Sequence, residues 1–362
     1  MLNGIRSLED HYGLSQYLKI KGIIVQNVLK RIRKRYLQYY FVLEGDSLKP
    51  IEIFAIKREY DDLYEYFIVD DSKLKGKPII EFSYRNQGYL SAREYTIDDF
   101  TEKGDPDSSK GKEVNVLNFC DKFYLGREDE YEYEEFKTTY MTMIREIKDY
   151  SNKMNADIIL AVYPEKIKEA IYYECPIGCL VQTDLKYGKF SGCLNNIKGL
   201  IYQLWVLKLM FEAINVTYIS IIDNKIDNKP YITISTVQVS TPYGDATFWF
   251  EFQLYENSVR PDIIFVREIN NQFDDIHKLL NYIYNRNVII ECKAGNYDNW
   301  KHEVREQIRY YRQIYKPKYL VLTSLKPSPK IRGADETFSP LHPGSKEVKR
   351  FKEYIRDIFI RL

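Results

Sequence analysis

The chain of 362 residues contains the stretch Val288-Ile289-Ile290-Glu291-Cys292-Lys293, in which an apolar run ends in an acid and a base. Such a continuous apolar run is typical of a strand buried in the middle of a sheet. Side chains alternate between the two faces of a strand, so Glu291 and Lys293 should share one face and Cys292 should point to the other. Burying an acid and a base is costly unless they are paired or hold a metal. We therefore expect a functional site at the end of this strand.

Two further motifs flank this strand in the sequence. Arg260-Pro261-Asp262 lies at the start of an expected strand over 259–266, and 28 residues separate Asp262 from Glu291. Downstream, Gln307 and Tyr311 are four residues apart on an expected helix over 299–315, so they share one helix face. The segment between the first two motifs predicts an inserted helix, because apolar residues recur there at helical spacing. These residues are Ile276, Leu279, Leu280 and Ile283.

The ordered motifs resemble the PD-(D/E)XK nuclease superfamily, with Pro261-Asp262 followed by Glu291-Cys292-Lys293. The Q-x-x-x-Y pair formed by Gln307 and Tyr311 is similar to that of the RecB-like branch. The resemblance covers residues 195–325 and implies an α/β (α+β) chain with a restriction-endonuclease-like mixed sheet flanked by helices. It also implies hydrolysis of phosphodiester bonds, with DNA favoured and RNA not excluded.

The resemblance implies a set of site residues. Mg²⁺ or Mn²⁺ would be bound by oxygen atoms of Asp262, Glu291 and the backbone carbonyl of Cys292, since hard cations prefer oxygen ligands. Lys293 would orient a water molecule or neutralise phosphate charge. Gln307 and Tyr311 would support a substrate phosphate or the metal ligands.

A helix expected over 198–214 supplies another candidate. The segment from Gly199 to Trp205 resembles a G-x-x-Y-E-x-W element of relatives, and Gln203 stands where those relatives carry glutamate. An amide can position a water but adds no negative charge. The relatives with this element include McrC-like restriction nuclease subunits, which implies a defence or repair role and a separate ATPase or GTPase motor subunit. The chain itself contains no G-x-x-x-x-G-K-[ST] motif.

Each motif also has a purely structural explanation. Glu291 and Lys293 could form an ion pair on a half-exposed strand, and Gln307 and Tyr311 could lie on a solvated helix face. The competing functional hypothesis is a catalytically weak protein with a nuclease fold that binds nucleic acid or assists assembly. Gln203 favours that alternative, whereas two convergent carboxylates favour the enzyme because they would repel phosphate in a simple binding module.

Charge is distributed unevenly along the chain. Residues 293–362 contain 16 lysines and arginines against eight acidic residues, a net charge of +8, whereas the rest of the chain carries −7. Arg305, Arg309 and Arg312 fall on the expected Q-x-x-x-Y helix and are candidate nucleic-acid contacts. The alternative is a charge-rich surface of a thermophilic protein, a class that the abundant lysine, glutamate and isoleucine also suggest.

The remaining sequence suggests a division into parts. Residues 1–155 should form a β-rich domain that binds substrate or partner and ends in a helix over 128–154, and 156–194 should connect it to the core. Residues 326–344 are expected to be irregular, before an amphipathic C-terminal helix that packs on the core or on a second subunit of a homodimer. Short strands are expected at 39–43, 51–56, 66–69, 78–83 and 157–162.

Two classes of protein are disfavoured by composition. No apolar run reaches the length of a membrane span and no signal peptide opens the chain, so we expect a soluble, cytoplasmic protein without membrane contacts. The cysteines lack the spacing of a metal cluster, which favours buried thiols or one disulfide. They are Cys120, Cys175, Cys179, Cys193 and Cys292.

Overall fold

A computed structural model describes the protein over residues 32–57, 64–68, 74–84, 90–100, 109–120, 122, 135–154, 191–222, 231–233, 235–254, 259–268 and 276–362. The chain forms two compact units. The first contains the N-terminal strands, and the second contains the helix that precedes residue 155 and the chain from Leu194 onward. The helix that we grouped with the N-terminal domain therefore belongs to the second unit. The expected strand at 157–162 and most of the connecting region lie outside the described residues.

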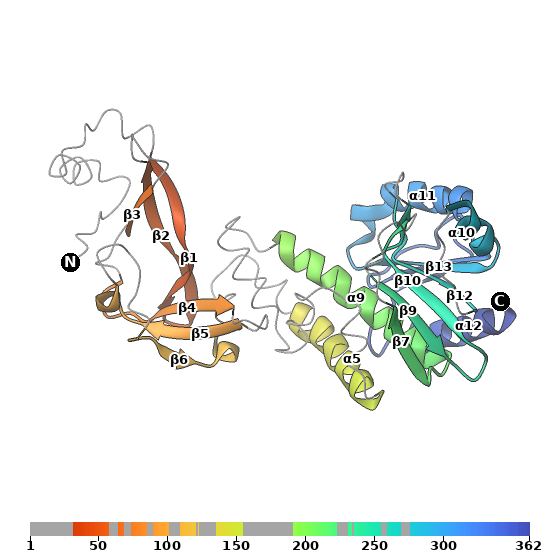
Figure 1. Ribbon diagram of the computed structural model, residues 1–362, viewed down its shortest axis with the longest axis horizontal. Helices are drawn as coiled ribbons and strands as arrows, with labels where there is room; N and C mark the ends of the chain where they lie inside the picture. The colour runs from red at the N-terminus through yellow and green to blue at the C-terminus, as the bar shows by residue number, and fades with distance from the viewer. Residues whose placement is uncertain are drawn as a thin grey trace. The chain divides into compact units, whose positions relative to one another are not determined.

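The first unit is built on an antiparallel sheet, in agreement with the expected β-rich N-terminal part (Figure 1). Its strand order is β3-β2-β1-β4-β5-β6. Phe82 packs edge-to-face against both Phe41 and Phe119 in the core. Cys120 is disulfide-bonded. The strands are β1 (Ile32–Glu44), β2 (Ser47–Lys57), β3 (Tyr64–Ile68), β4 (Ile79–Tyr84), β5 (Leu90–Tyr95) and β6 (Lys112–Val114).

The second unit contains a seven-stranded mixed sheet with the order β15-β14-β13-β12-β10-β9-β7. The pairs β13–β14 and β14–β15 are parallel, whereas β12 runs antiparallel to both β10 and β13. The chain is thus of the expected α+β class. The strands are β7 (Tyr218–Ile222), β9 (Ser235–Ser240), β10 (Ala246–Phe250), β12 (Ile263–Val266), β13 (Asn287–Lys293), β14 (Tyr319–Ser324) and β15 (Glu336–Phe338), with a separate pair of β8 (Tyr231–Ile232) and β11 (Gln253–Leu254).

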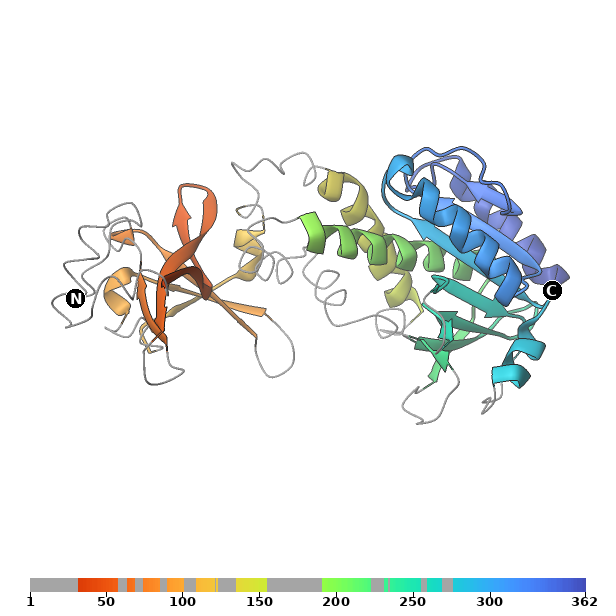
Figure 2. The ribbon, with the colours of Figure 1, turned by 90° about the horizontal axis from the view of Figure 1, so that it is seen from above.

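Helices cover both faces of this sheet (Figures 1 and 2). Strand residues alternate in direction, so Ile264 and Ile289 pack with the apolar side of α11, whereas Phe265 on the other face stacks on Phe359 of α12. Phe211 of α9 contacts Phe248 on that second face. The helices are η4 (Phe136–Tyr140, a π-helix), α5 (Met141–Lys153), α9 (Ser191–Ala213), α10 (Ile276–Ile283), α11 (Tyr297–Ile314) and α12 (Glu347–Arg361).

Several expected elements of this unit are present at nearly the expected positions. Helix α10 is the inserted helix between β12 and β13, and α12 is the C-terminal amphipathic helix. The aromatic contacts of α12 show that its apolar face packs on the core. The prediction that residues 326–344 are irregular was wrong in part, because this segment contains β15, which extends the sheet beside β14. None of the helices in the described ranges is both long enough and apolar enough to cross a lipid bilayer.

Candidate functional site

The two candidate acids lie side by side where β12 and β13 meet. Ile263 pairs with Ile290 in the antiparallel ladder, so Asp262, one residue before β12, falls opposite Glu291. Directly opposed residues point to the same face of a sheet. That face is the one covered by α11, where the apolar layer of Ile264 and Ile289 ends. The pleat therefore places two carboxylates at the edge of an apolar core.

Glu291 is held at both carboxylate oxygens. Its side chain is 2% exposed, and Oε1 lies 2.7 Å from the Lys293 Nζ. Oε2 accepts a hydrogen bond of 2.9 Å from the Tyr311 hydroxyl, whose single proton is shared with the Arg260 carbonyl at 3.2 Å. Burial lowers the pKa of Lys293, but the negative charges of Glu291 and Asp262 raise it above its ordinary value. The ammonium is therefore charged at neutral pH.

Asp262 is less well compensated than Glu291. Its Oδ2 accepts a hydrogen bond of 2.6 Å from the Cys292 amide. Burial, followed by the charge of Glu291, holds the pKa of Asp262 well above its usual range, against the opposing effects of Lys293 and the Cys292 amide. One lysine thus faces two acids. A cation bound beside Asp262 would relieve this imbalance.

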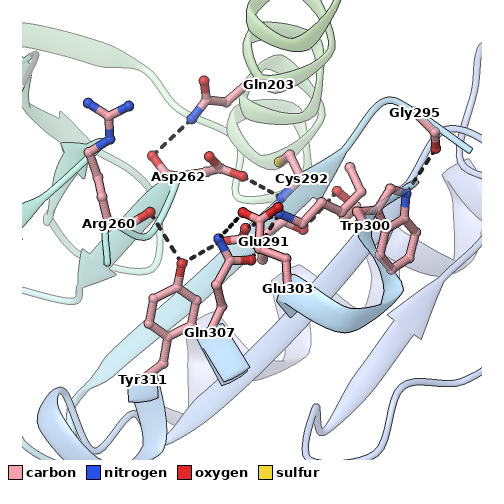
Figure 3. Close-up of polar contacts among 12 residues, drawn as sticks. Gln203, Arg260, Asp262, Glu291, Cys292, Gly295, Trp300, Glu303, Gln307 and Tyr311 are labelled. Carbon is pink, nitrogen blue, oxygen red and sulfur yellow. Dashed lines mark hydrogen bonds and ion pairs between the residues drawn. The ribbon is translucent and has the colours of Figure 1, made fainter. Parts of the chain in front are cut away.

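Helix α11 brings Gln307 to the same site, as Figure 3 shows. The Lys293 Nζ donates to Gln307 Oε1 at 3.0 Å, and Gln307 Nε2 donates to Glu303 Oε1 at 2.9 Å. Gln307 and Tyr311 therefore contact the acid–base pair on β13 from one helix face. Glu303 was not among the residues singled out from the sequence. Its position four residues before Gln307 was the available signal, because i and i+4 side chains are neighbours on a helix.

A cavity of about 630 Å³ opens over this cluster. Acidic and basic side chains both contribute to its walls, so the local charge is mixed rather than uniformly basic. Arg260, which also lines the cavity, pairs with Glu251 at 2.8 Å. The lining residues are Val259, Arg260, Asp262, Glu291, Lys293, Glu303, Glu306, Gln307, Arg309, Tyr310 and Gln313.

Gln203 reaches the site from α9 but contacts the main chain. Its Nε2 donates to the Asp262 carbonyl at 3.1 Å, and its side chain is not among those lining the cavity (Figure 3). The same carbonyl accepts the Glu251 amide at 2.8 Å. Cys292 has its side chain on the opposite face from Glu291, where burial raises the pKa of its thiol. Gln203 therefore supports the backbone that carries Asp262.

The three candidate arginines of α11 differ in their surroundings. Arg309 lines the cavity, whereas Arg305 is exposed and lies outside its lining. Arg312 is bound elsewhere: its guanidinium lies 2.7 Å from Asp335 and donates to the carbonyls of Gly333 and Pro317. Arg312 thus fastens the segment before β15 to α11, a role that its sequence position among basic residues did not reveal.

The donor set suits a hard divalent cation only if water or substrate completes it. Among the described residues, no group of three or more histidine, cysteine, aspartate or glutamate side chains has an arrangement able to hold a metal ion. Asp262 and Glu291 provide two adjacent carboxylates, and burial, followed by the charge of Glu291, raises the pKa of Asp262. These oxygen donors fit Mg²⁺ or Mn²⁺, which commonly retain several water ligands.

No protein-family model, curated protein or solved structure matches this chain.

Proposed function

We propose that this protein is a metal-dependent nuclease that hydrolyses phosphodiester bonds, with DNA as the favoured substrate. The observation that carries the proposal is the convergence of Asp262, Glu291 and Lys293 on one cavity, with one more carboxylate than ammonium. The motif resemblance to PD-(D/E)XK nucleases supports the same assignment. A defence or repair role, and a motor subunit that delivers the substrate, are part of this proposal.

Each candidate site residue would have its own role in such a reaction. Asp262 and Glu291 would hold Mg²⁺ or Mn²⁺ with the Cys292 carbonyl, and the ion supplies an acidified water and positive charge near the scissile phosphate. Lys293 carries a permanent positive charge and faces the cavity, so it can contact a phosphate oxygen or orient the attacking water. Tyr311 fixes the Glu291 carboxylate through its hydroxyl.

The proposed substrate contacts follow from the cavity walls. Arg309 of α11 and Arg260 of the segment before β12 are cations that border the cavity, and both can contact phosphate oxygens. Glu303 and Glu306 border it as well, so the phosphate backbone would be attracted mainly by the metal-loaded form. This mixed lining favours binding that depends on divalent cations.

One observation favours the alternative of a catalytically weak protein that binds nucleic acid or assists assembly. Both Glu291 oxygens already have partners, and Gln203 adds no negative charge. A metal would have to replace or share these contacts. Under this alternative, nucleic acid binds without being cleaved.

The deciding experiment incubates purified protein with labelled single- and double-stranded DNA and RNA, in Mg²⁺, Mn²⁺ or chelator. We expect metal-dependent cleavage that is lost in Lys293→Ala and retained in Lys301→Ala. Lys301 is a suitable control because it lies on α11 and pairs with Asp298 outside the cavity. Binding without cleavage in every metal would support the scaffold alternative. Cleavage that persists in Lys293→Ala would contradict the assigned site.

A further inference from the structure

A continuous chain of polar contacts links the cavity mouth to the buried acid. Glu303 Oε1 accepts from Gln307 Nε2 at 2.9 Å, and Gln307 Oε1 accepts from Lys293 Nζ at 3.0 Å. Lys293 Nζ then contacts Glu291 Oε1 at 2.7 Å. The chain connects α11 to β13, and Glu303 at its outer end is exposed (Figure 3). It therefore has a solvent-facing carboxylate at one end and a buried carboxylate at the other.

The two ends of the Gln307 amide are not equivalent. A primary amide has an acceptor oxygen and a donor NH₂ group, and rotation about its last bond exchanges them. An ionised carboxylate such as Glu303 only accepts, and an ammonium such as Lys293 only donates. Glu303 therefore requires the NH₂ end, which turns the oxygen toward Lys293. The acid on the helix selects the amide orientation that the lysine needs.

We infer that Glu303 is a positioning residue for Lys293 and acts through the Gln307 amide. An ammonium has three N–H donors, and Glu291 and Gln307 take two of them among the described residues. Two fixed acceptors define the direction of the third donor, which belongs to a side chain lining the cavity. Glu303 thus helps aim the donor that would meet a substrate phosphate or the attacking water. The inference rests on the proposed nuclease function.

Glu306 provides an internal comparison for this role. It is also an exposed glutamate of α11 and lines the same cavity. It has the same charge as Glu303 and directly precedes Gln307 in the sequence. Within the described residues it makes no hydrogen bond to Gln307 or Lys293, whereas Glu303 does. A general effect of cavity charge would appear at both positions, but the orienting effect only at Glu303.

The test compares matched variants at the two positions by single-turnover DNA cleavage. We expect Glu303→Gln to keep at least a third of the rate, because its amide oxygen still accepts from Gln307. Glu303→Leu should cleave about tenfold more slowly, in line with the loss of one hydrogen bond to a charged network. Glu303→Lys should be slower still, because a donor there favours the reversed amide. Glu306→Gln and Glu306→Leu should cleave at rates equal to each other, because within the described residues Glu306 makes no contact with Gln307 that the leucine variant would lose.

Affinity separates positioning from substrate binding. DNA affinity, measured by fluorescence anisotropy with Ca²⁺ in place of Mg²⁺, should be the same in Glu303→Gln and Glu303→Leu while their cleavage rates differ. Equal rates in these two neutral variants would overturn the inference, because only the acceptor distinguishes them. Equal losses at positions 303 and 306 would overturn it as well.

Thermal unfolding tests the chain of contacts without relying on catalysis. If the wild-type protein cleaves no nucleic acid, the proposed function is contradicted, but the positioning role of Glu303 can still be tested. The Tm of Glu303→Gln should exceed that of Glu303→Leu. In a Lys293→Met background this difference should shrink by at least half, because no ammonium then depends on the amide orientation. A difference of equal size in both backgrounds, or no difference in either, would overturn the positioning role.

Discussion

Two lysines of the second unit, the buried Lys208 and the partly buried Lys293, have similar partners but different charge balance. Lys208 of α9 contacts Glu146 of α5 at 3.0 Å and Glu212 at 3.1 Å. Glu212 also pairs with Lys352 of α12, so two lysines meet two glutamates. Lys293 instead faces Glu291 and Asp262, and no second lysine pairs with either acid among the residues that the structure describes.

The contrast shows which feature distinguishes the candidate site. Both clusters border a cavity, of about 520 Å³ beside Glu212 and Lys352 and about 630 Å³ beside Lys293. The presence of a cavity therefore does not distinguish the two lysine clusters. The balanced cluster fastens α5 and α12 to α9, with Trp205 donating to Glu146 at 2.8 Å. In the cluster at Lys293, burial and then the charge of the neighbouring Glu291 hold the pKa of Asp262 well above its usual range.

The largest effect should come from breaking the balanced cluster. Lys208→Met leaves Glu146 and Glu212 with Lys352 as their one remaining lysine partner among the described residues, and we expect it to lower the free energy of unfolding by about 3 kcal/mol without changing the proposed nuclease activity. Lys293→Met should abolish cleavage with a smaller loss of stability, because Asp262 can take up a proton. Urea unfolding followed by tryptophan fluorescence reports this unit, since all three tryptophans lie in it. If both variants lose the same stability and both still cleave, the two lysine clusters do not differ in function.

An intermediate effect is expected from adding a third acid beside Asp262. Gln203→Glu removes the donor to the Asp262 carbonyl and sets an acceptor against it in a position that is 3% exposed. The free energy of unfolding should fall by about 1–2 kcal/mol. Mn²⁺ affinity, measured by calorimetry, should not increase. Tighter Mn²⁺ binding together with faster cleavage would instead identify residue 203 as part of the metal site.

The smallest effect should come from removing the unmatched charge. Asp262→Asn keeps an oxygen that can accept the Cys292 amide, and the metal-free variant should be more stable than wild type by on the order of 1 kcal/mol at pH 8. The folded pKa of Asp262 lies above its unfolded value, so the contribution of Asp262 to wild-type stability should fall as pH rises from about 4 toward the folded pKa. The variant should lack this decrease.

Urea unfolding in chelator across pH measures this slope. Asp298→Asn is the control, because Lys301 lowers the pKa of that exposed carboxyl and its charge is favourable. It should not gain stability at pH 8. Mg²⁺ should raise the free energy of unfolding of the wild type more than that of Asp262→Asn, since a ligand that binds only the folded state shifts the unfolding equilibrium toward that state. If the difference in stability between wild type and Asp262→Asn does not change across this pH range, the Asp262 charge is not the source of the destabilisation.

The fold of the second unit was largely predictable from local patterns. Continuous apolar runs located β12, β13 and β14, because these strands are buried on both faces, and helical spacing located α10, α11 and α12, because one face of each helix is buried. The strand β15 was missed, since its three residues carry no periodic signal and depend on pairing with β14. The assignment of α5 to the second unit was also missed, because its partners Trp205 and Lys208 are about 60 residues away in the sequence.

The sequence by itself determined which residues share a face of a strand or helix. Glu291 with Lys293, and Gln307 with Tyr311, follow from the backbone geometry of a strand and a helix. Only the tertiary structure decided which partners these residues meet: Gln203 contacts a carbonyl, Arg312 binds Asp335, and Lys293 donates to the Gln307 amide oxygen. The physical reason is that periodicity is a property of neighbouring residues, whereas hydrogen-bond partners and charge balance depend on segments that only folding brings together.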